Sequence, residues 1–501
     1  MSTIRRQSII SSGIVYFGFA LGFLNTLLFT KEHGGFTPEQ YGLTTIFLVI
    51  ANIMYYFANL GMQAYIFKFY PYYNDNLPPE KNDMITWSLL VSFLGFLLVI
   101  CGGLVFKSWV IRKFGANSPE LIKYYYWVFP LGFGLTLYSL LEAFAWQLKR
   151  SILTNFLREV LFRLFTTILI VLIFTGILKS FDLFIKIYAF TYMFLALILA
   201  FILLKYKELH FTISPSRVTR KFFRKIFTQI SLVWGGGLVY YISLLFAQLV
   251  IAAVVPGGLT YVAVYSLAQY IASLIQAPQR VIVSAATGPL SQAWKDKDYA
   301  KISRIYKRSS INQLIFSVGM FVLIWINFTD GVLTFHLKNT YLDARYVFLF
   351  IGLTRIIDMG TGLNSHVIAT STLWRFDFFT GIILAALTLP MNYILAKTEG
   401  VIGPAIADLI TFSIYNAIRF VFLYQRFNMQ PFTFKTLYTL LLGLVAYLIC
   451  HALFASYEGI LWIFVRSTVF MAIYVSGVLG LNLSEDVIPV LRTIRKRLGM
   501  K

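Results

Sequence analysis

The sequence has few charged residues and almost no cysteine. Of its 501 residues, 13% are charged and 58% are hydrophobic, whereas soluble domains are about 25% charged and roughly 45–50% apolar. The two cysteines, Cys101 and Cys450, both lie within apolar runs. Two isolated thiols make neither a disulfide framework nor a metal site. The composition therefore argues against a soluble protein, and the cysteine count argues against a disulfide-rich or zinc-stabilised fold.

Motifs for nucleotides and catalytic metals are also missing. The sequence contains no Walker A pattern, no dinucleotide fingerprint and no HExxH motif, so we do not expect ATP-driven pumping by this chain alone. No loop between apolar runs is long enough for a catalytic domain, because domains have roughly 50–250 residues. We therefore predict a protein that is not an enzyme, with no catalytic residue and no metal site.

The sequence does contain a long series of apolar runs. Runs of about 20 residues cross a bilayer core of roughly 30 Å, and each run should be helical because backbone polar groups cannot go unpaired in lipid. The fold prediction is therefore an all-α integral membrane protein with fourteen transmembrane helices. The expected spans are 8–30, 41–66, 84–106, 123–146, 160–178, 184–204, 229–254, 259–283, 310–328, 344–366, 376–396, 401–423, 435–455 and 459–482.

The net charge of +22 is explained by membrane topology. Lys and Arg are densest at 205–225, 295–308 and 492–501. All three groups fall on one side of the membrane when the N-terminus is cytoplasmic, as the positive-inside rule requires. We therefore expect both termini in the cytoplasm and no binding of nucleic acid.

The first half of the chain resembles the second half. At an offset of 224 residues, "GIVYF" at 13–17 aligns with "GLVYY" at 237–241, and "YGL" at 41–43 with "YSL" at 265–267. Six spans per half start both halves on the same side, which predicts a parallel repeat with the substrate path between two lobes. The predicted parts are an N-lobe (1–205), a basic cytoplasmic linker (206–228), a C-lobe (229–425), a two-helix appendix (426–482) and a basic tail (483–501).

Two spans that this repeat relates each carry a polar stripe. Their polar residues are spaced 0, 4, 7 and 11, which is one helix face. The stripes are Asn52, Tyr56, Asn59 and Gln63 on the second span, and Gln269, Ser273, Gln276 and Arg280 on the eighth. Amides at helix–helix contacts are an alternative explanation. On the first and seventh spans we add Asn25, Tyr241 and Gln248 as candidates for lining a wet space between the lobes.

Charges inside spans are the strongest functional signal, because each costs about 2.5–3.5 kcal/mol at a helix centre. The arginines Arg280, Arg355 and Arg419 suit a phosphate or carboxylate ligand; snorkelling towards the membrane surface is the alternative for Arg280 and Arg419. Arg466 falls in the appendix, where a role in a central path is doubtful. The acids Glu142, Asp358 and Asp408 are candidates for ion coupling, and Arg355 and Asp358 are close enough along one helix to pair.

Several stretches resemble a known family. They are "RRQSIISSGIVYFGFALGFLNTLLF", "FTPEQYGLTTIF", "FANLGMQAYIFKFYP" and the loop "LSQAWKDKDYAKISRIYKR". They are similar to polysaccharide (O-antigen, Wzx-type) flippases of the multidrug/oligosaccharidyl-lipid/polysaccharide exporter superfamily, and the similarity covers essentially the whole chain. The resemblance implies movement of an undecaprenyl-pyrophosphate-linked oligosaccharide from the inner to the outer leaflet of the bacterial cytoplasmic membrane, as in lipopolysaccharide and other polysaccharide biosynthesis.

The same resemblance implies alternating access of the two lobes, no cofactor, and coupling to H⁺ or Na⁺. Expected partners are the lipid-linked glycan, membrane lipids and, in some systems, a polymerase or glycosyltransferases; the chain is expected to act as a monomer. Three alternatives stay open: a small-molecule or drug antiporter, a lipid II flippase, and a non-transporting scaffold of a glycan assembly complex. The absence of arginine from the first four spans argues against lipid II flipping, and the two extra helices argue against drug export.

Overall fold

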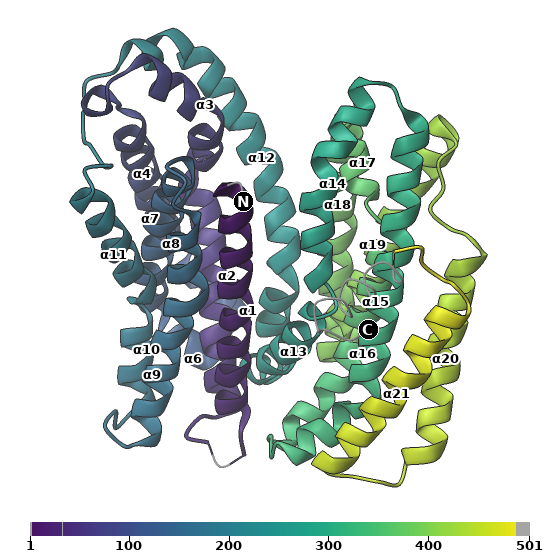
Figure 1. The fold of residues 1–501 in the computed structure, drawn as a ribbon. Coiled ribbons are helices and arrows are strands. Elements are labelled where there is room, and N and C mark those ends of the chain that lie inside the picture. Colours follow the sequence, from purple (N-terminus) through teal and green to yellow (C-terminus); the bar gives the residue numbers. More distant parts are fainter. Residues whose placement is uncertain (1–2, 33, 487–501) are drawn as a thin grey trace. The chain divides into compact units, whose positions relative to one another are not determined.

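Long helices make up nearly all of the structure (Figure 1). The computed structural model describes residues 3–32 and 34–486, without the side chains of residues 3–12, 229, 232, 280, 281, 284 and 374. Within these ranges no β-strand occurs. Contacts divide the chain into two compact units, Met1–Ala263 and Val264–Lys501, called unit 1 and unit 2 below.

Unit 1 contains twelve helices and three short irregular turns. They are α1 (Thr3–Thr30), α2 (Pro38–Asn59), α3 (Met62–Asn76), η1 (Pro79–Lys81), α4 (Met84–Val105), α5 (Lys107–Phe114), α6 (Pro119–Lys123), η2 (Tyr125–Trp127), α7 (Val128–Gln147), α8 (Ser151–Asn155), η3 (Phe156–Leu161), α9 (Phe162–Phe174), α10 (Phe181–Tyr188), α11 (Thr191–Lys205) and α12 (Arg217–Val254). The segment η3 is a single π-helical turn.

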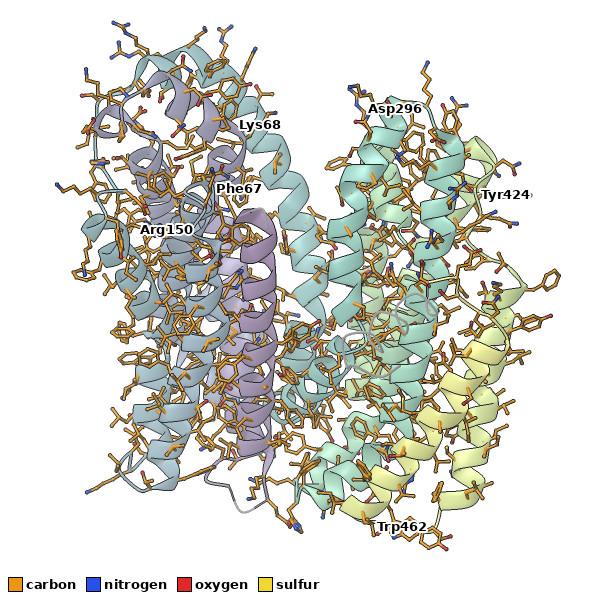
Figure 2. The ribbon with its side chains drawn as sticks, viewed as in Figure 1. Phe67, Lys68, Arg150, Asp296, Tyr424 and Trp462 are labelled. Carbon is orange, nitrogen blue, oxygen red and sulfur yellow. The ribbon has the colours of Figure 1, made fainter. Side chains whose placement is uncertain are left out.

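Unit 2 starts within α13 (Gly258–Ser273), whose first residues belong to unit 1. Its other elements are α14 (Ala277–Lys295), α15 (Tyr299–Thr334), η4 (Asn339–Asp343), α16 (Ala344–Gly360), α17 (Asn364–Ala369), α18 (Trp374–Glu399), η5 (Gly400–Ile402), α19 (Gly403–Phe427), α20 (Phe434–Phe454) and α21 (Ile460–Gly480). Figure 2 shows Asp296 and Tyr424 at one end of unit 2 and Trp462, near the start of α21, at the opposite end.

Ten segments of the described residues are long and apolar enough to cross a membrane. One of them, Arg375–Phe427, contains both α18 and α19. Three expected spans instead correspond to shorter helices: α9 has 13 residues, α13 has 16 and α16 has 17. The all-α membrane fold is therefore confirmed, whereas the count of fourteen spans stays a prediction.

The expected linker 206–228 is partly helical. The hydroxyl of Ser216 accepts a hydrogen bond from the backbone N–H of Thr219 (3.2 Å) and caps α12, which then runs for 38 residues. No glycine or proline interrupts the basic stretch after Ser216, so nothing stops the helix before the apolar segment. Contacts place α12 in unit 1, beyond the 1–205 expected for the N-lobe; the predicted domain boundaries remain predictions.

Close helix contacts in unit 1 depend on glycine. A Cβ on Gly42 of α2 would lie 1.8 Å from the carbonyl oxygen of Leu259, and a Cβ on Gly134 of α7 would lie 2.2 Å from the backbone N of Met193. Small residues allow this approach of helix backbones, which stabilises membrane helices through van der Waals packing. These glycines therefore fix which helices of unit 1 lie side by side.

The segment 290–310, expected as a loop, is almost entirely helical. It is the end of α14 and the start of α15, joined by residues 296–298. Ile302 and Tyr306 are fully buried in a cluster with Leu363 and Leu423, and the indole N–H of Trp294 donates to the carbonyl of Val367 (2.9 Å). The apolar face of the segment packs within unit 2.

Arg466 of α21 joins helices at the other end of unit 2. Its guanidinium pairs with Asp330 of α15 (3.4 Å) and donates to the carbonyls of Ile326 (2.8 Å) and Tyr457 (2.7 Å). Asp330 also accepts from the backbone N–H of Gly459 (2.9 Å). Both charged side chains are at most 9% exposed. Arg466 therefore satisfies the backbone at the α20–α21 turn, which explains a charge in the appendix without a transport role.

Candidate functional site

A helix break organises the polar residues of the second expected span. The run 41–66 is not one helix: α2 ends at Asn59, Leu60 and Gly61 have positive φ angles (46° and 78°), and α3 starts at Met62. Glycine tolerates this backbone, and a Cβ on Gly61 would also lie 2.5 Å from the side chain of Ile230. The polar stripe expected on one straight helix face is therefore interrupted between Asn59 and Gln63.

Hydrogen bonds join the side chains on the two sides of this break. The hydroxyl of Tyr55 donates to the amide oxygen of Gln63 (2.5 Å), and the amide of Asn59 donates to the same hydroxyl (3.4 Å). The side-chain oxygen of Asn59 accepts from the backbone N–H of Gln63 (3.0 Å). The Asn59 side chain thus satisfies a backbone N–H freed by the broken helix, and the Gln63 side chain is held by Tyr55, which the sequence stripe did not include.

Two other candidates of this stripe, Tyr56 and Asn52, make contacts of their own. Tyr56 stacks on Tyr241 of α12, with ring centroids 3.8 Å apart and an interplanar angle of 17°. Asn52 donates to the carbonyl of Leu48 in its own helix (2.7 Å). The structure therefore joins candidates from the second and seventh spans within unit 1. Gln248 of α12 is buried.

Glu142 of α7 is a buried acid of unit 1 that lies beside the half-exposed Arg158. Its side chain is 3% exposed, and one oxygen accepts from Arg158 (3.2 Å). Within the described structure the other oxygen, Oε1, is buried without a hydrogen-bond partner. Because an unpaired buried carboxylate is costly, this oxygen is a place where a proton or small cation could bind.

The π-turn η3 and the helix that follows it, α9, supply the cations of this region. Arg158 lies on the turn, and Arg163 on the following helix pairs with Glu159 (3.0 Å). Asn25 of α1 donates to the carbonyl of Arg163 (2.9 Å) and accepts from Thr167 (2.6 Å). Asn25 therefore holds α1 against α9 in this structure. Single π-turns inside helices are frequent at functional sites.

In unit 2, Asp408 of α19 sits among polar groups from two other helices. It accepts from the hydroxyl of Tyr265 (3.3 Å) and from the amide of Asn392 (3.3 Å). The guanidinium of Arg355 on α16 is close enough to interact with it electrostatically, although no ion pair within 4 Å joins them among the described residues. The Nε atom of Arg355 is buried and unpaired there.

Asp358 does not pair with Arg355, as their spacing had suggested. Its carboxylate accepts from the amides of Gln279 (3.2 Å) and Asn416 (3.3 Å). Asn416 in turn accepts from Asn364 (2.8 Å). The predicted pairing is wrong because neutral amides on neighbouring helices bind the Asp358 carboxylate instead. Arg355 interacts electrostatically with Asp408.

Arg419 does not snorkel towards water. Its side chain is 3% exposed and forms an ion pair with Asp377 of α18. Its Nε atom donates to Thr380 (3.2 Å), and the guanidinium carbon lies 3.8 Å from the centroid of the Tyr415 ring. Arg419 is thus held within the α18–α19 pair. A ligand phosphate would have to compete with Asp377 for it.

The remaining candidates lie on the broken eighth span. The expected helix 259–283 is interrupted at 274–276, between α13 and α14, with Gln269 on α13 and Gln276 directly before α14. The side chain of Arg280 lies outside the described part of the structure. The proposed repeat relation between the two polar stripes therefore remains a prediction.

Sequence reasoning missed three charged residues of these regions. Arg163 lies within the expected span 160–178, so its position in the sequence already marked it as an intramembrane charge. Arg158 and Asp377 lie at or near the ends of expected spans and become relevant only through partners that are distant in sequence. Arg158 lies beside the buried Glu142, whereas Arg163 pairs with the partly exposed Glu159; both follow the first four expected spans.

Comparison with known proteins identifies the fold. No family model and no curated protein matches the chain. Among solved structures, a lipid II flippase, MurJ, in an inward closed conformation matches with a TM-score of 0.70 and 16% identity, covering 94% of this chain and 98% of that one. An inward-facing multidrug resistance MATE family transporter of the MOP superfamily matches with a TM-score of 0.60 and 19% identity, covering 84% and 98%.

A Vibrio cholerae MATE transporter, VcmN, in the bent form matches with a TM-score of 0.51 and 12% identity, covering 85% of this chain and 98% of that one. At these identities the likeness concerns the fold. The chain has the multi-pass helical fold shared by the MurJ and MATE structures.

Proposed function

We propose that this protein is a flippase that moves a lipid-linked oligosaccharide, carried on undecaprenyl pyrophosphate, from the inner to the outer leaflet of the bacterial cytoplasmic membrane. One observation carries the proposal: the lipid II flippase structure covers 94% of this chain, against 84% for the first MATE structure. The difference is about a tenth of the chain, the size of the α20–α21 region. This supports a cargo of the lipid-linked class over a soluble drug.

The polar groups of both units support such a cargo. Arg355 has a guanidinium without a carboxylate partner in the described structure, and a guanidinium binds phosphate oxygens in a planar, bidentate way. Tyrosine hydroxyls and amides, such as those of Tyr55, Asn59 and Gln63, both donate and accept hydrogen bonds, as sugar hydroxyls require. We propose Arg355 of unit 2 as a candidate for binding the pyrophosphate. Within unit 1, taken by itself, the tyrosine–amide cluster of α2 and α3 is a candidate for binding sugar hydroxyls.

Ion coupling would use the buried carboxylates. Glu142 has an unpaired oxygen, and Asp408 and Asp358 are hydrogen-bonded mainly by neutral groups. Such carboxylates can exchange a proton, or bind Na⁺ with neighbouring hydroxyl and amide oxygens. We propose that loading these sites with H⁺ or Na⁺ drives alternating access, and transport measurements in an imposed pH or Na⁺ gradient test which ion is coupled.

The test is the location of the substrate after depletion of the protein. Polyprenyl-linked glycans are extracted from depleted cells, and their membrane face is measured with an impermeant sugar-oxidising label. We expect one glycan to accumulate on the cytoplasmic face. Normal glycan distribution with increased sensitivity to cationic dyes would refute flipping and favour the drug antiporter.

Arg355→Ala separates transport from a scaffold role. We expect a protein that reaches the membrane but accumulates its glycan on the cytoplasmic face, because the pyrophosphate loses its free cation. Arg426→Ala, on the exposed end of α19, is the matched control and should behave as wild type. Normal transport by Arg355→Ala would contradict our assignment of the pyrophosphate site.

Lipid II flipping is the second candidate, favoured by the MurJ fold likeness and by Arg158 and Arg163 in unit 1. It predicts that this chain supports growth of cells depleted of their own lipid II flippase. The oligosaccharide proposal predicts failure of that rescue. We propose further that the protein acts as a monomer with both termini in the cytoplasm, which reporter fusions at each end would test.

A further inference from the structure

A basic pocket lies at one end of unit 2 and shares no lining residue with the clusters around Asp408, Asp358 and Arg419. It has a volume of about 420 Å³ and is formed by the start of α15, the start of α20 and the residues that follow α21. Its charged lining residues are Arg304, Lys307, Arg308, Lys435, Glu485 and Asp486. Cations therefore outnumber acids by two, which favours an anionic ligand.

Hydrogen bonds fix one wall of this basic pocket. Asp486 pairs with Arg308 and accepts from Asn312 (2.7 Å). Asn312 also accepts from the hydroxyl of Ser484 (2.5 Å), and Lys435 donates to the carbonyl of Asn482 (2.7 Å). Arg308 holds the pKa of Asp486 below its usual range, so this acid is ionised and occupied. The wall is thus ordered, and Arg308 is already neutralised.

Two cations of the basic pocket have no such partner. Arg304 and Lys307 are exposed on α15, and no carboxylate lies within 4 Å of either among residues 3–32 and 34–486. Residues three apart lie on neighbouring positions of a helix surface. Their charges therefore face the same space, which can take an anion.

The basic pocket lies where three helices leave the apolar zone. α15 has 36 residues, a length of about 54 Å, which exceeds a bilayer core of roughly 30 Å. Its apolar part starts at Ile311, directly after the cations, while α20 starts at Phe434 and α21 ends at Gly480. Phe434 is 80% exposed, and Leu437 and Leu481 are each 52% exposed. The cations of the pocket and these exposed apolar side chains therefore lie at the same end of the apolar segments.

We propose that the basic pocket binds the phosphate head group of an anionic phospholipid. Arg304 and Lys307 contact the phosphate, and the acyl chains lie against the exposed apolar residues of α20 and α21. A soluble phosphate ester would match the positive charge of the pocket, but it has no acyl chains to cover the exposed apolar residues beside it. The site is separate from the proposed substrate clusters and does not depend on which molecule the protein transports.

The experiment uses the full-length protein purified in neutral detergent. A photoreactive phosphatidylglycerol is titrated in, and crosslinks to the peptide containing Phe434 are measured by mass spectrometry. Phosphatidylcholine and glycerol phosphate are tested as competitors. We expect unlabelled phosphatidylglycerol to compete strongly and the other two weakly.

The decisive variant is Arg304→Gln with Lys307→Gln. One Lys or Arg near an anionic lipid contributes about 1 kcal/mol, so losing two should lower the apparent affinity about thirtyfold. The matched control, Lys297→Gln with Lys301→Gln, removes the same charge from residues that do not line the pocket; it should stay within about twofold of wild type.

Three outcomes would overturn the proposal. They are wild-type crosslinking by the Arg304/Lys307 variant, an equal loss in the control variant, and crosslinks only at other peptides. Competition by glycerol phosphate as strong as that by phosphatidylglycerol would assign the pocket to a soluble phosphate ester instead of a lipid. Both cations are exposed and unpaired, so the variants are expected to fold, and equal elution on gel filtration checks this.

Discussion

Replacing Arg466 by methionine tests whether an arginine inside a membrane helix can serve structure alone. Arg466 and Asp330 are at most 9% exposed, and Arg466 also satisfies two backbone carbonyls. Removing one partner of a buried ion pair costs about 3–5 kcal/mol, because the other charge is left uncompensated. We therefore expect Arg466→Met to lower the free energy of local opening at the α20–α21 turn by about 3 kcal/mol or more.

Cys450 can be used to measure local opening at the α20–α21 turn. Cys450 is buried and lines the same cavity as Arg466, of about 220 Å³, whereas Cys101 is exposed and can be replaced by serine. Labelling of Cys450 by a thiol-reactive fluorophore tracks the open population when closing is fast. A loss of 3 kcal/mol then accelerates labelling about 150-fold.

The partner variant makes the test quantitative. Asp330→Asn keeps a side chain that can accept from Gly459 but removes the charge. Because the two residues are in contact, the double variant should be less destabilised than the sum of the single variants, by about 0.5–3 kcal/mol. A change in labelling of less than threefold for Arg466→Met, or simple additivity in the double variant, would refute the structural role.

Three further predictions concern other parts of the chain. Gly42→Ala should abolish accumulation of folded protein, measured by gel filtration, while Gly102→Ala, where nothing lies within 4 Å, should not. The pKa of Asp486 is lowered in the folded protein, so this carboxylate stabilises the fold fully at pH values above the ordinary aspartate pKa of about 3.9. That stabilisation is lost as the pH falls through the lower pKa of the folded state. Asp486→Asn should therefore make thermal stability less dependent on pH below about pH 4. Glu142→Gln should keep the fold but remove ion-driven transport in vesicles, and unchanged coupling would exclude this acid.

The sequence was sufficient for the fold class but not for the partners of its polar residues. Hydropathy reports length and composition, and these predicted the all-helical membrane fold, whereas the count of fourteen spans stays a prediction. Charge pairs are long-range features: Arg419 meets Asp377 across two helices, and Arg158 meets Glu142 through an irregular turn. Spacing within one helix suggested that Arg355 pairs with Asp358, but amides from neighbouring helices take that place.

Helix breaks were the second source of error. The break at Leu60 and Gly61 interrupts an apolar run whose hydropathy is continuous. The sequence signal was Gly61 itself, because glycine directly after a helix commonly adopts a positive φ. Hydropathy windows average over such a residue, which is why the run was predicted as one helix.

The π-turn at Phe156–Leu161 makes this part of the chain sensitive to the deletion of a single residue. A π-turn holds one more residue than the α-helical turn it replaces, and each residue rotates a helix by about 100°. Deleting one residue there would leave an unbroken helix but rotate α8 relative to α9. Either Arg158 would leave Glu142, or the carbonyl of Arg163 would leave Asn25. The extra residue of the π-turn thus sets the rotation of α8 relative to α9, so that Arg158 reaches Glu142 while the carbonyl of Arg163 reaches Asn25.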